Sequence, residues 1–334
     1  MKKRNILFGA VGAVSTGIAV KMLTRKKTVN YDDVAATLPH AENSHLTEVD
    51  GVTIHYQEFG DPADPTLLLI HGYTASSYVW DESAPLLSEN GFRVIAVDMP
   101  GFGYSDKPAW FDYSITSQAR VLSRFMNRIG IGRATVVGSS YGGAVAATLA
   151  LDYPERVEKL VLVSAVCNDA PKEHPILRLA SIPGIGELIT PFLISSRTFL
   201  RHRMYKTLAP ANHHMIDQDR IGNIHRPLNA ADAHHSILAT SRNWHANRIE
   251  RDANLIEQPT LIIWGEDDRV IPIEDGHSLH SSILHSRLVV LKDCGHVPQE
   301  EKSNLFSEIV TEFCRDRRGH IGPHGDEMRI EPES

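Results

Sequence analysis

The stretch that decides the fold is ATVVGSSYGG at residues 134–143, where an apolar run passes directly into a turn rich in glycine. Its residues 138–142 fit the pattern G-x-S-x-G, with Ser140 in the middle. A helix-compatible stretch follows at 143–153, and Pro154 ends it. The pattern predicts a strand, a sharp turn and a helix. Glycines two positions either side of Ser140 remove the Cβ atoms that would collide in such a turn.

Strand-like runs alternate with helix-length segments on both sides of this turn. The runs at 67–70 and 160–163 consist of aliphatic residues only, as strands that are buried on both faces require. This order predicts an α/β fold with a mostly parallel central sheet and helices on both of its faces. The predicted strands are 52–58, 66–70, 93–97, 134–137, 159–163, 260–264 and 287–291.

The alternation stops between residues 167 and 255, where helix-like pieces broken by proline and glycine replace strands. An insertion of about 90 residues is too long for a plain loop, so we expect a helical cap over one edge of the sheet. The cap divides the predicted core into 46–166 and 256–315. A linker at 28–45 precedes the core, and the polar residues 316–334 are predicted to form a disordered tail.

The first 27 residues differ from the rest of the chain. Lys2, Lys3 and Arg4 precede an uncharged run at 6–20, which is the pattern of a signal peptide or of a membrane anchor. The run is short of the about 20 residues that a spanning helix needs, although residues up to 24 could extend it. Because no convincing cleavage site follows, we expect an uncleaved anchor, with membrane association through residues 5–24.

Two alternatives to this anchor stay open. A cleaved signal would make the protein secreted or periplasmic, and the segment could also be a frayed terminus. Basic residues flank both ends of the run, so the positive-inside rule leaves the side of the membrane undetermined.

Composition narrows the class of partner. The chain has 334 residues with a formal net charge of -7, and therefore has no basic field that would hold a nucleic-acid backbone. Its three cysteines have no paired spacing, which argues against a disulfide framework or a thiolate metal site. The histidine pairs at 213–214 and 234–235 point about 100° apart on a helix and cannot both face one ion unaided. We expect a small-molecule or lipid substrate, no metal and no cofactor.

Ser140 needs a base, because a serine hydroxyl is a poor nucleophile until its proton is removed. His296 lies in DCGH at 293–296, just beyond the predicted strand 287–291. It comes last in chain order, as the order Ser, Asp, His of a strand–turn–helix hydrolase requires. We therefore expect His296 to be the base.

The acid that orients this base should follow the strand 260–264, where three carboxylates compete. Asp268 is our choice, because the following RVIP at 269–272 turns the chain away at once and leaves Asp268 in the loop that can reach His296. Asp267 remains an alternative, and Glu266 a weaker one. The acid would accept the second ring N–H of the histidine and stabilise the imidazolium.

An oxyanion hole needs two backbone N–H donors. One is expected from Tyr141, directly after the nucleophile. The second is expected from the loop HGYT at 71–74, where Gly72 permits the turn and Tyr73 N–H is the donor.

Five elements of the sequence together resemble the α/β-hydrolase superfamily, over about residues 46–313. They are His71-Gly72, the segment DMPGFGYS at 98–105, the turn GSSYGG at 138–143, Asp268 with Pro272, and Gly295-His296. The resemblance implies a serine esterase or lipase, because haloalkane dehalogenases and epoxide hydrolases carry an aspartate at the nucleophile position. An anchored N-terminus joined to a capped hydrolase resembles the monoacylglycerol lipase branch. We interpret the segment 98–105 as a structural turn.

The cap segment 182–194 is apolar and broken by proline and glycine, as a movable lid or the wall of an acyl-chain site would be. It could equally be a cap helix that buries its apolar face on the core. Combined with the predicted anchor, it leads us to expect hydrolysis of carboxylic esters with lipid-like or medium-chain acyl groups, through an acyl-enzyme on Ser140.

Two rival functions remain at this point. The first is hydrolysis of a carbon–carbon bond with the same fold and triad, although such enzymes carry a glycine-rich stretch after His71-Gly72 and a Trp where this chain has Val297. The second is a ligand-binding module without turnover. The sequence does not separate esterase from thioesterase, amidase or perhydrolase activity, because specificity depends on the shape of the site.

Overall fold

The computed structural model describes residues 31–173, 178–179, 181–316 and 327–330. Within these residues nine strands form one sheet in the order β1-β2-β4-β3-β5-β6-β7-β8-β9. Strand β2 pairs antiparallel with β1 and β4, and all pairings from β4 to β9 are parallel, which confirms the predicted mostly parallel sheet. The strands are β1 Ser44–Val49, β2 Val52–Phe59, β3 Thr66–Ile70, β4 Arg93–Val97, β5 Ala134–Ser139, β6 Val157–Val163, β7 Thr260–Gly265, β8 Ser286–Leu291 and β9 Glu327–Ile330.

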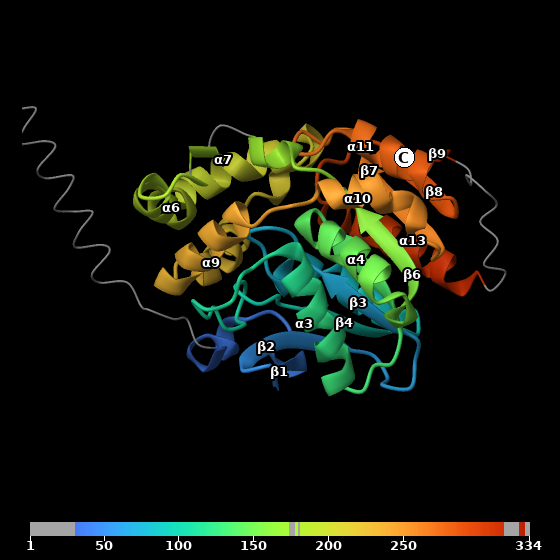
Figure 1. Cartoon of the computed structure of the whole chain (residues 1–334), viewed down its shortest axis with the longest axis horizontal. Coiled ribbons are helices and arrows are strands. Elements are labelled where there is room, and N and C mark those ends of the chain that lie inside the picture. The colour runs from blue at the N-terminus through green and yellow to red at the C-terminus, as the bar shows by residue number, and fades with distance from the viewer. Residues whose placement is uncertain (1–30, 174–177, 180, 317–326, 331–334) are drawn as a thin grey trace, which may run out of the picture.

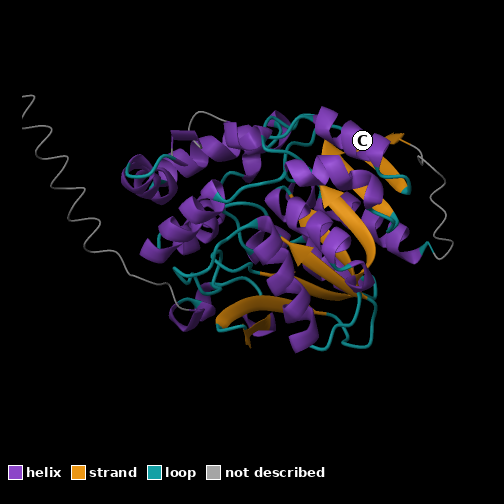
Figure 2. Cartoon of the chain, viewed as in Figure 1, coloured by secondary structure: helices purple, strands orange, loops and turns teal. Residues whose placement is uncertain are grey.

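Helices cover both faces of this sheet (Figures 1 and 2). On one face, α3 (Ile115–Arg128), α4 (Tyr141–Asp152) and α11 (Ile273–Ser282) pack against the strands. On the other face lie α2 (Ser83–Glu89) and α13 (Ser303–Arg315).

Alternate side chains of the central strands supply the two cores. Along β3, Leu68 and Ile70 belong to the core under α3 and α4, while Leu67 and Leu69 belong to the core under α2 and α13. All four are at most 1% exposed. Successive side chains of a strand point to opposite faces, so a strand that is covered on both faces must be apolar throughout.

The residues described between β6 and β7 contain helices and no strand, in agreement with the predicted helical cap. The helices of this stretch include α6 Ile185–Ser195, α7 Arg197–Thr207, α8 Gln218–Leu228, α9 Ala231–Arg242 and α10 Asn247–Asp252. A small apolar cluster within the cap includes Leu200 and Met204 of α7 and Ile221 of α8. In Figure 1, α6, α7 and α9 gather to one side of the sheet.

Two edge strands differ from the sequence prediction. Strand β1 begins at Ser44, inside the predicted linker 28–45, and β9 lies inside the predicted disordered tail 316–334. Both were missed because neither is an apolar run: β1 reads SHLTEV, and three of its six residues are exposed. Each pairs on one side only, β1 with β2 and β9 with β8, and backbone hydrogen bonding makes few demands on the side chains of an edge strand.

The predicted anchor at 1–27 lies outside the described residues. Among the helices that the structure does describe, none is long and apolar enough to cross a membrane.

Candidate active site

Ser140 lies in a sharp turn between β5 and α4. Its backbone angles are φ 55° and ψ -119°, in a region that residues other than glycine rarely adopt. Hydrogen bonds hold the turn on both sides: Ser140 N–H donates to Val163 O at 2.9 Å, and Ser140 O accepts from Val166 N–H at 3.0 Å. The turn places the Ser140 hydroxyl at the carboxyl end of the sheet, above the N-terminus of α4.

The glycines of this turn are needed for close approach. A Cβ atom on Gly138 would lie 2.3 Å from Gly142 O, and one on Gly142 would lie 2.3 Å from Ile70 O. Contacts of this length are far inside van der Waals distance, so any larger residue would displace the backbone around Ser140. The predicted role of these two glycines is therefore confirmed.

His296 lies between Ser140 and Asp268 after the end of β8. Its Nε2 is 3.0 Å from Ser140 Oγ, and its Nδ1 is 2.8 Å from Asp268 Oδ2. A carboxylate only accepts hydrogen bonds, so Nδ1–H must donate to Asp268. In the neutral ring Nε2 is then free to accept the Ser140 hydroxyl proton, which is the arrangement that a general base requires.

The Asp268 carboxylate is fully buried beside this ring. Its Oδ1 accepts from the N–H groups of Val270 at 2.8 Å and Ile271 at 3.0 Å. Burial alone would raise the pKa of Asp268, but the charge and hydrogen bond of His296, with these two N–H donors, hold it below its usual value. Asp268 is therefore ionised at neutral pH.

Among the described residues, neither of the two alternative acids is hydrogen-bonded to the His296 ring. Glu266 is exposed and forms an ion pair with Arg329 at 3.5 Å. The backbone N–H of Asp267 donates to Cys294 O at 2.9 Å, and within the described part of the chain its carboxylate forms no ion pair with His296. Only Asp268 of the three contacts the ring there.

The loop after β3 lies against the nucleophile. A Cβ on Gly72 would be 3.1 Å from Ser140 Cβ, so the peptide that joins Gly72 to Tyr73 runs directly beside the serine. In the described residues neither Tyr73 N–H nor Tyr141 N–H donates to another backbone group. Their role as the two oxyanion donors stays a prediction.

His71 holds this loop from behind. Its Nε2 accepts from Met99 N–H at 3.1 Å, so the proton of the neutral ring is on Nδ1, which donates to Gly72 O at 2.8 Å. Gly72 O and Tyr73 N–H belong to the same planar peptide, and the hydrogen bond therefore orients the Tyr73 donor. Burial lowers the pKa of His71, which favours this neutral form.

Asp98 is the polar centre of the segment 98–105, which we predicted to be structural. Its carboxylate is fully buried and accepts from His55 Nδ1–H at 2.8 Å, Ser77 N–H at 2.6 Å and Tyr104 N–H at 2.8 Å. Burial raises the pKa of Asp98, but the hydrogen bonds from His55 and from Tyr104 N–H outweigh it and bring the pKa to about 2.

This shift predicts a pH-dependent loss of stability in Asp98→Asn. The folded pKa is depressed from 3.8 to about 2, so the ionised carboxylate contributes stability above pH 3.8 that is lost as the pH falls through about 2. At pH 7 the variant should lose about 2 kcal/mol of unfolding free energy. Urea unfolding followed by circular dichroism at pH 7, 5, 4 and 3 should show the difference from the parent shrinking below pH 4. Asp219→Asn, at an exposed position, is the control, and a difference independent of pH would contradict the assignment.

Glu301 is a site residue that the sequence analysis missed. One oxygen of its buried carboxylate accepts from Gly295 N–H at 2.9 Å and from Val297 N–H at 3.4 Å, on the two sides of His296. The other accepts from Ala209 N–H at 2.8 Å and from Asn212 Nδ2 at 2.7 Å, both in the cap. Glu301 thereby joins the loop that carries His296 to the cap.

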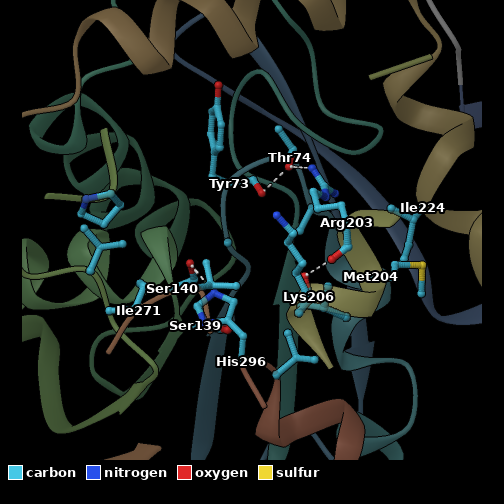
Figure 3. Close-up of a pocket in the computed structure, with 18 of the residues that line it drawn as sticks. Tyr73, Thr74, Ser139, Ser140, Arg203, Met204, Lys206, Ile224, Ile271 and His296 are labelled. Carbon is cyan, nitrogen blue, oxygen red and sulfur yellow. Dashed lines mark hydrogen bonds between the residues drawn. The ribbon is translucent and has the colours of Figure 1, made fainter. Parts of the chain in front are cut away.

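A cavity of about 740 Å³ opens between the cap and the carboxyl ends of the strands, with Ser140 and His296 in its wall (Figure 3). This volume is within the range of small-molecule sites. Half of the residues that line it have apolar side chains, and those contributed by the cap include Leu193, Ile194, Phe199, Met204, Leu208, Ile224, Ile237, Leu238 and Trp244. Among the described residues no group of three His, Cys, Asp or Glu side chains is placed to hold a metal ion.

Comparison with known proteins places the chain among hydrolases. Residues 65–183 and 199–303 match the family model described as alpha/beta hydrolase fold. The uncharacterized hydrolase YugF of Bacillus subtilis is 29% identical over 272 residues, which are 80% of this chain and 96% of the relative. A 2-hydroxy-6-oxononadienedioate/2-hydroxy-6-oxononatrienedioate hydrolase of Burkholderia vietnamiensis is 29% identical over 278 residues, 78% of this chain and 91% of the relative.

Solved structures give the same picture. The meta-cleavage product hydrolase CumD of Pseudomonas fluorescens superposes with a TM-score of 0.70 at 25% identity, over 82% of this chain and 98% of CumD. A membrane phospholipase A, described as a bacterial virulence factor, superposes with a TM-score of 0.69 at 25% identity, over 95% of this chain and 99% of the phospholipase.

Proposed function

This chain belongs to the alpha/beta hydrolase fold family, and from that premise we propose that it is a serine hydrolase that cleaves carboxylic esters through an acyl-enzyme on Ser140. The observation that carries the proposal is the chain of hydrogen bonds from Asp268 through His296 to Ser140 in the wall of the cavity. Three residues far apart in the sequence meet in the order that activates a serine hydroxyl.

In the acylation step Ser140 Oγ attacks the carbonyl carbon of the ester while His296 Nε2 takes the hydroxyl proton. The carbonyl oxygen becomes an oxyanion, which the N–H groups of Tyr73 and Tyr141 stabilise. Asp268 stabilises the imidazolium without taking its proton. The intermediate then expels the alcohol, which receives the proton from His296, and the acyl group stays on Ser140.

In the deacylation step a water molecule gives a proton to His296 Nε2 and attacks the acyl carbon. The same two N–H groups stabilise the second oxyanion. When the intermediate collapses, Ser140 Oγ leaves with the proton from His296 and the carboxylic acid is released. Every group returns to its starting state, with no cofactor.

We assign a lipid-like or medium-chain acyl group to the substrate. The aliphatic side chains of the cap give the cavity a wall on which methylene groups lose their contact with water, at about 0.8 kcal/mol for each buried group. The similarity to the membrane phospholipase A over 95% of this chain supports the same substrate class. In this proposal residues 5–24 bring the enzyme to its substrate at a membrane.

Hydrolysis of a carbon–carbon bond is the second candidate. The 2-hydroxy-6-oxononadienedioate hydrolase of Burkholderia vietnamiensis and CumD support it, because each is covered almost completely by this chain. The same three residues would act, with a carbanion in place of the alcohol as leaving group.

Hydrolysis of p-nitrophenyl esters from acetate to dodecanoate, beside a 2-hydroxy-6-oxo-dienoate, tests the two candidates together. We expect kcat/KM to rise by roughly tenfold or more from acetate to octanoate, because each methylene group adds apolar contact in the cavity. Dienoate cleavage with a higher kcat/KM than every ester would reject the ester proposal in favour of the second candidate. A preference for acetate would reject only the lipid-directed part.

A ligand-binding module without turnover is tested separately with a fluorophosphonate probe. Labelling requires an activated serine, so the folded parent should react at Ser140 and His296→Ala should not. A folded parent that stays unlabelled would favour the binding module.

A further inference from the structure

Arg203 of α7 is a cation in the wall of the cavity. Its Nη1 donates to Thr74 Oγ1 at 2.7 Å, which places the guanidinium beside the loop that carries Tyr73 (Figure 3). Among the residues that the structure describes, no Asp or Glu forms an ion pair with Arg203. Burial lowers the pKa of this guanidinium, a cost that an ion-pair partner would offset.

The guanidinium has more donors than the protein uses. Arginine offers five N–H groups in a planar fork, and one of them is engaged with Thr74. Arg203 is half-buried, and a charge that is partly removed from water is stabilised by a partner of opposite sign. The remaining N–H groups of Arg203 therefore suit a ligand that brings its own negative charge.

The acidic side chains of the cavity do not supply that charge. Glu300 of the core forms an ion pair with Arg220 of α8. Asp275 accepts from Asn168 Nδ2 at 3.3 Å. Lys206, one turn after Arg203 on α7, also lines the cavity, and in Figure 3 it points into the same space. This part of the wall is thus positively charged.

We propose that Arg203 binds an anionic oxygen group, a carboxylate or a phosphate, carried by the ester that Ser140 cleaves. This inference rests on the proposed function and narrows its substrate class to amphipathic anionic esters. The forked N–H groups match two oxygens of a carboxylate or phosphate at once, which fixes orientation as well as charge. The acyl chain lies along the apolar part of the wall while the anion lies near Thr74, and the ester carbonyl faces Ser140.

Two pairs of esters that differ by one anionic group test this proposal in the full chain. One pair, p-nitrophenyl butyrate and p-nitrophenyl hydrogen glutarate, places a carboxylate on the acyl side. The other, monodecanoylglycerol and its phosphate, places a phosphate on the alcohol side. The parent should prefer the anionic member of at least one pair by about tenfold or more in kcat/KM, since hydrogen bonds to charged groups are strong. The pair that shows the preference identifies the source of the anion.

Arg203→Met should lower this preference by roughly 10- to 100-fold, and Arg203→Lys, which keeps a charge but loses the fork, should retain part of it. The matched control is Arg201→Met, which removes an exposed arginine of the same helix outside the cavity and should leave the preference unchanged. The Lys variant keeps a long cationic side chain, so it serves if the Met variant does not fold.

Two results would overturn the assignment of Arg203. One is a parent that prefers neither anionic ester, and the other is a preference that survives in full in both Arg203 variants. Either result would leave ester turnover that depends on Ser140. Failure of the proposed function is different, because it would appear as absence of Ser140-dependent turnover on all four esters.

Discussion

Ser140→Ala should lower kcat for ester hydrolysis by roughly 10⁴- to 10⁶-fold, with little change in KM. The hydroxyl 3.0 Å from His296 Nε2 is the atom that attacks the ester, and alanine removes it without filling new space. The variant should still bind substrate, because the cavity walls and the N–H groups of Tyr73 and Tyr141 remain. Stopped assays on p-nitrophenyl octanoate over hours would measure the residual rate.

Ser139→Ala is the matched control for this experiment. Ser139 precedes Ser140, but its Oγ accepts from Gln299 Nε2 at 3.3 Å. We expect kcat within about tenfold of the parent, as for a change that removes one neutral hydrogen bond. Thermal melts of both variants would establish that they are folded. Turnover above about one hundredth of the parent rate in folded, pure Ser140→Ala would contradict Ser140 as nucleophile.

The turn around Ser140 could be predicted because its signals are local. A buried strand, a glycine-flanked serine and a helix follow one another within 20 residues, and the observed β5 and α4 agree with that order. The strands β3 and β4 agree with their predicted bounds residue for residue, because an apolar run between turn residues is itself the requirement of a strand buried on both faces.

Elements that depend on distant partners could not be predicted in this way. Strand β9 forms by pairing with the free edge of β8. The sequence EMRI at 327–330 contains no pattern that predicts this pairing. Glu301 follows Pro298 in a short helix and resembles many surface carboxylates. Its four N–H donors come from the His296 loop and from the cap, about 90 residues earlier in the chain. The position of Arg203 in the cavity wall depends on its contact with Thr74, 129 residues earlier, which the sequence does not show.

The acid was the least determined member of the predicted site, because residues 266–268 offer three carboxylates in a row. Their difference arises in the loop after β7, where Ile271 O accepts from Trp264 Nε1–H of the strand at 3.1 Å and fixes the path of the loop. The loop then wraps the N–H groups of Val270 and Ile271 around the carboxylate of Asp268, which is turned inward to His296.

Asp268→Asn should therefore lower kcat by about 10⁴-fold, while Asp267→Asn should leave it within about threefold of the parent. An asparagine at 268 that donates its amide N–H toward His296 Nδ1 forces the ring proton onto Nε2, where it can no longer accept the Ser140 proton. The fold is preserved, since the side-chain shape is unchanged. kcat on p-nitrophenyl octanoate, measured for both variants across pH 5–9, decides between the two residues. If Asp267→Asn lost activity and Asp268→Asn kept it, Asp267 would be the acid. Equal small losses in both variants would mean that His296 acts without either carboxylate.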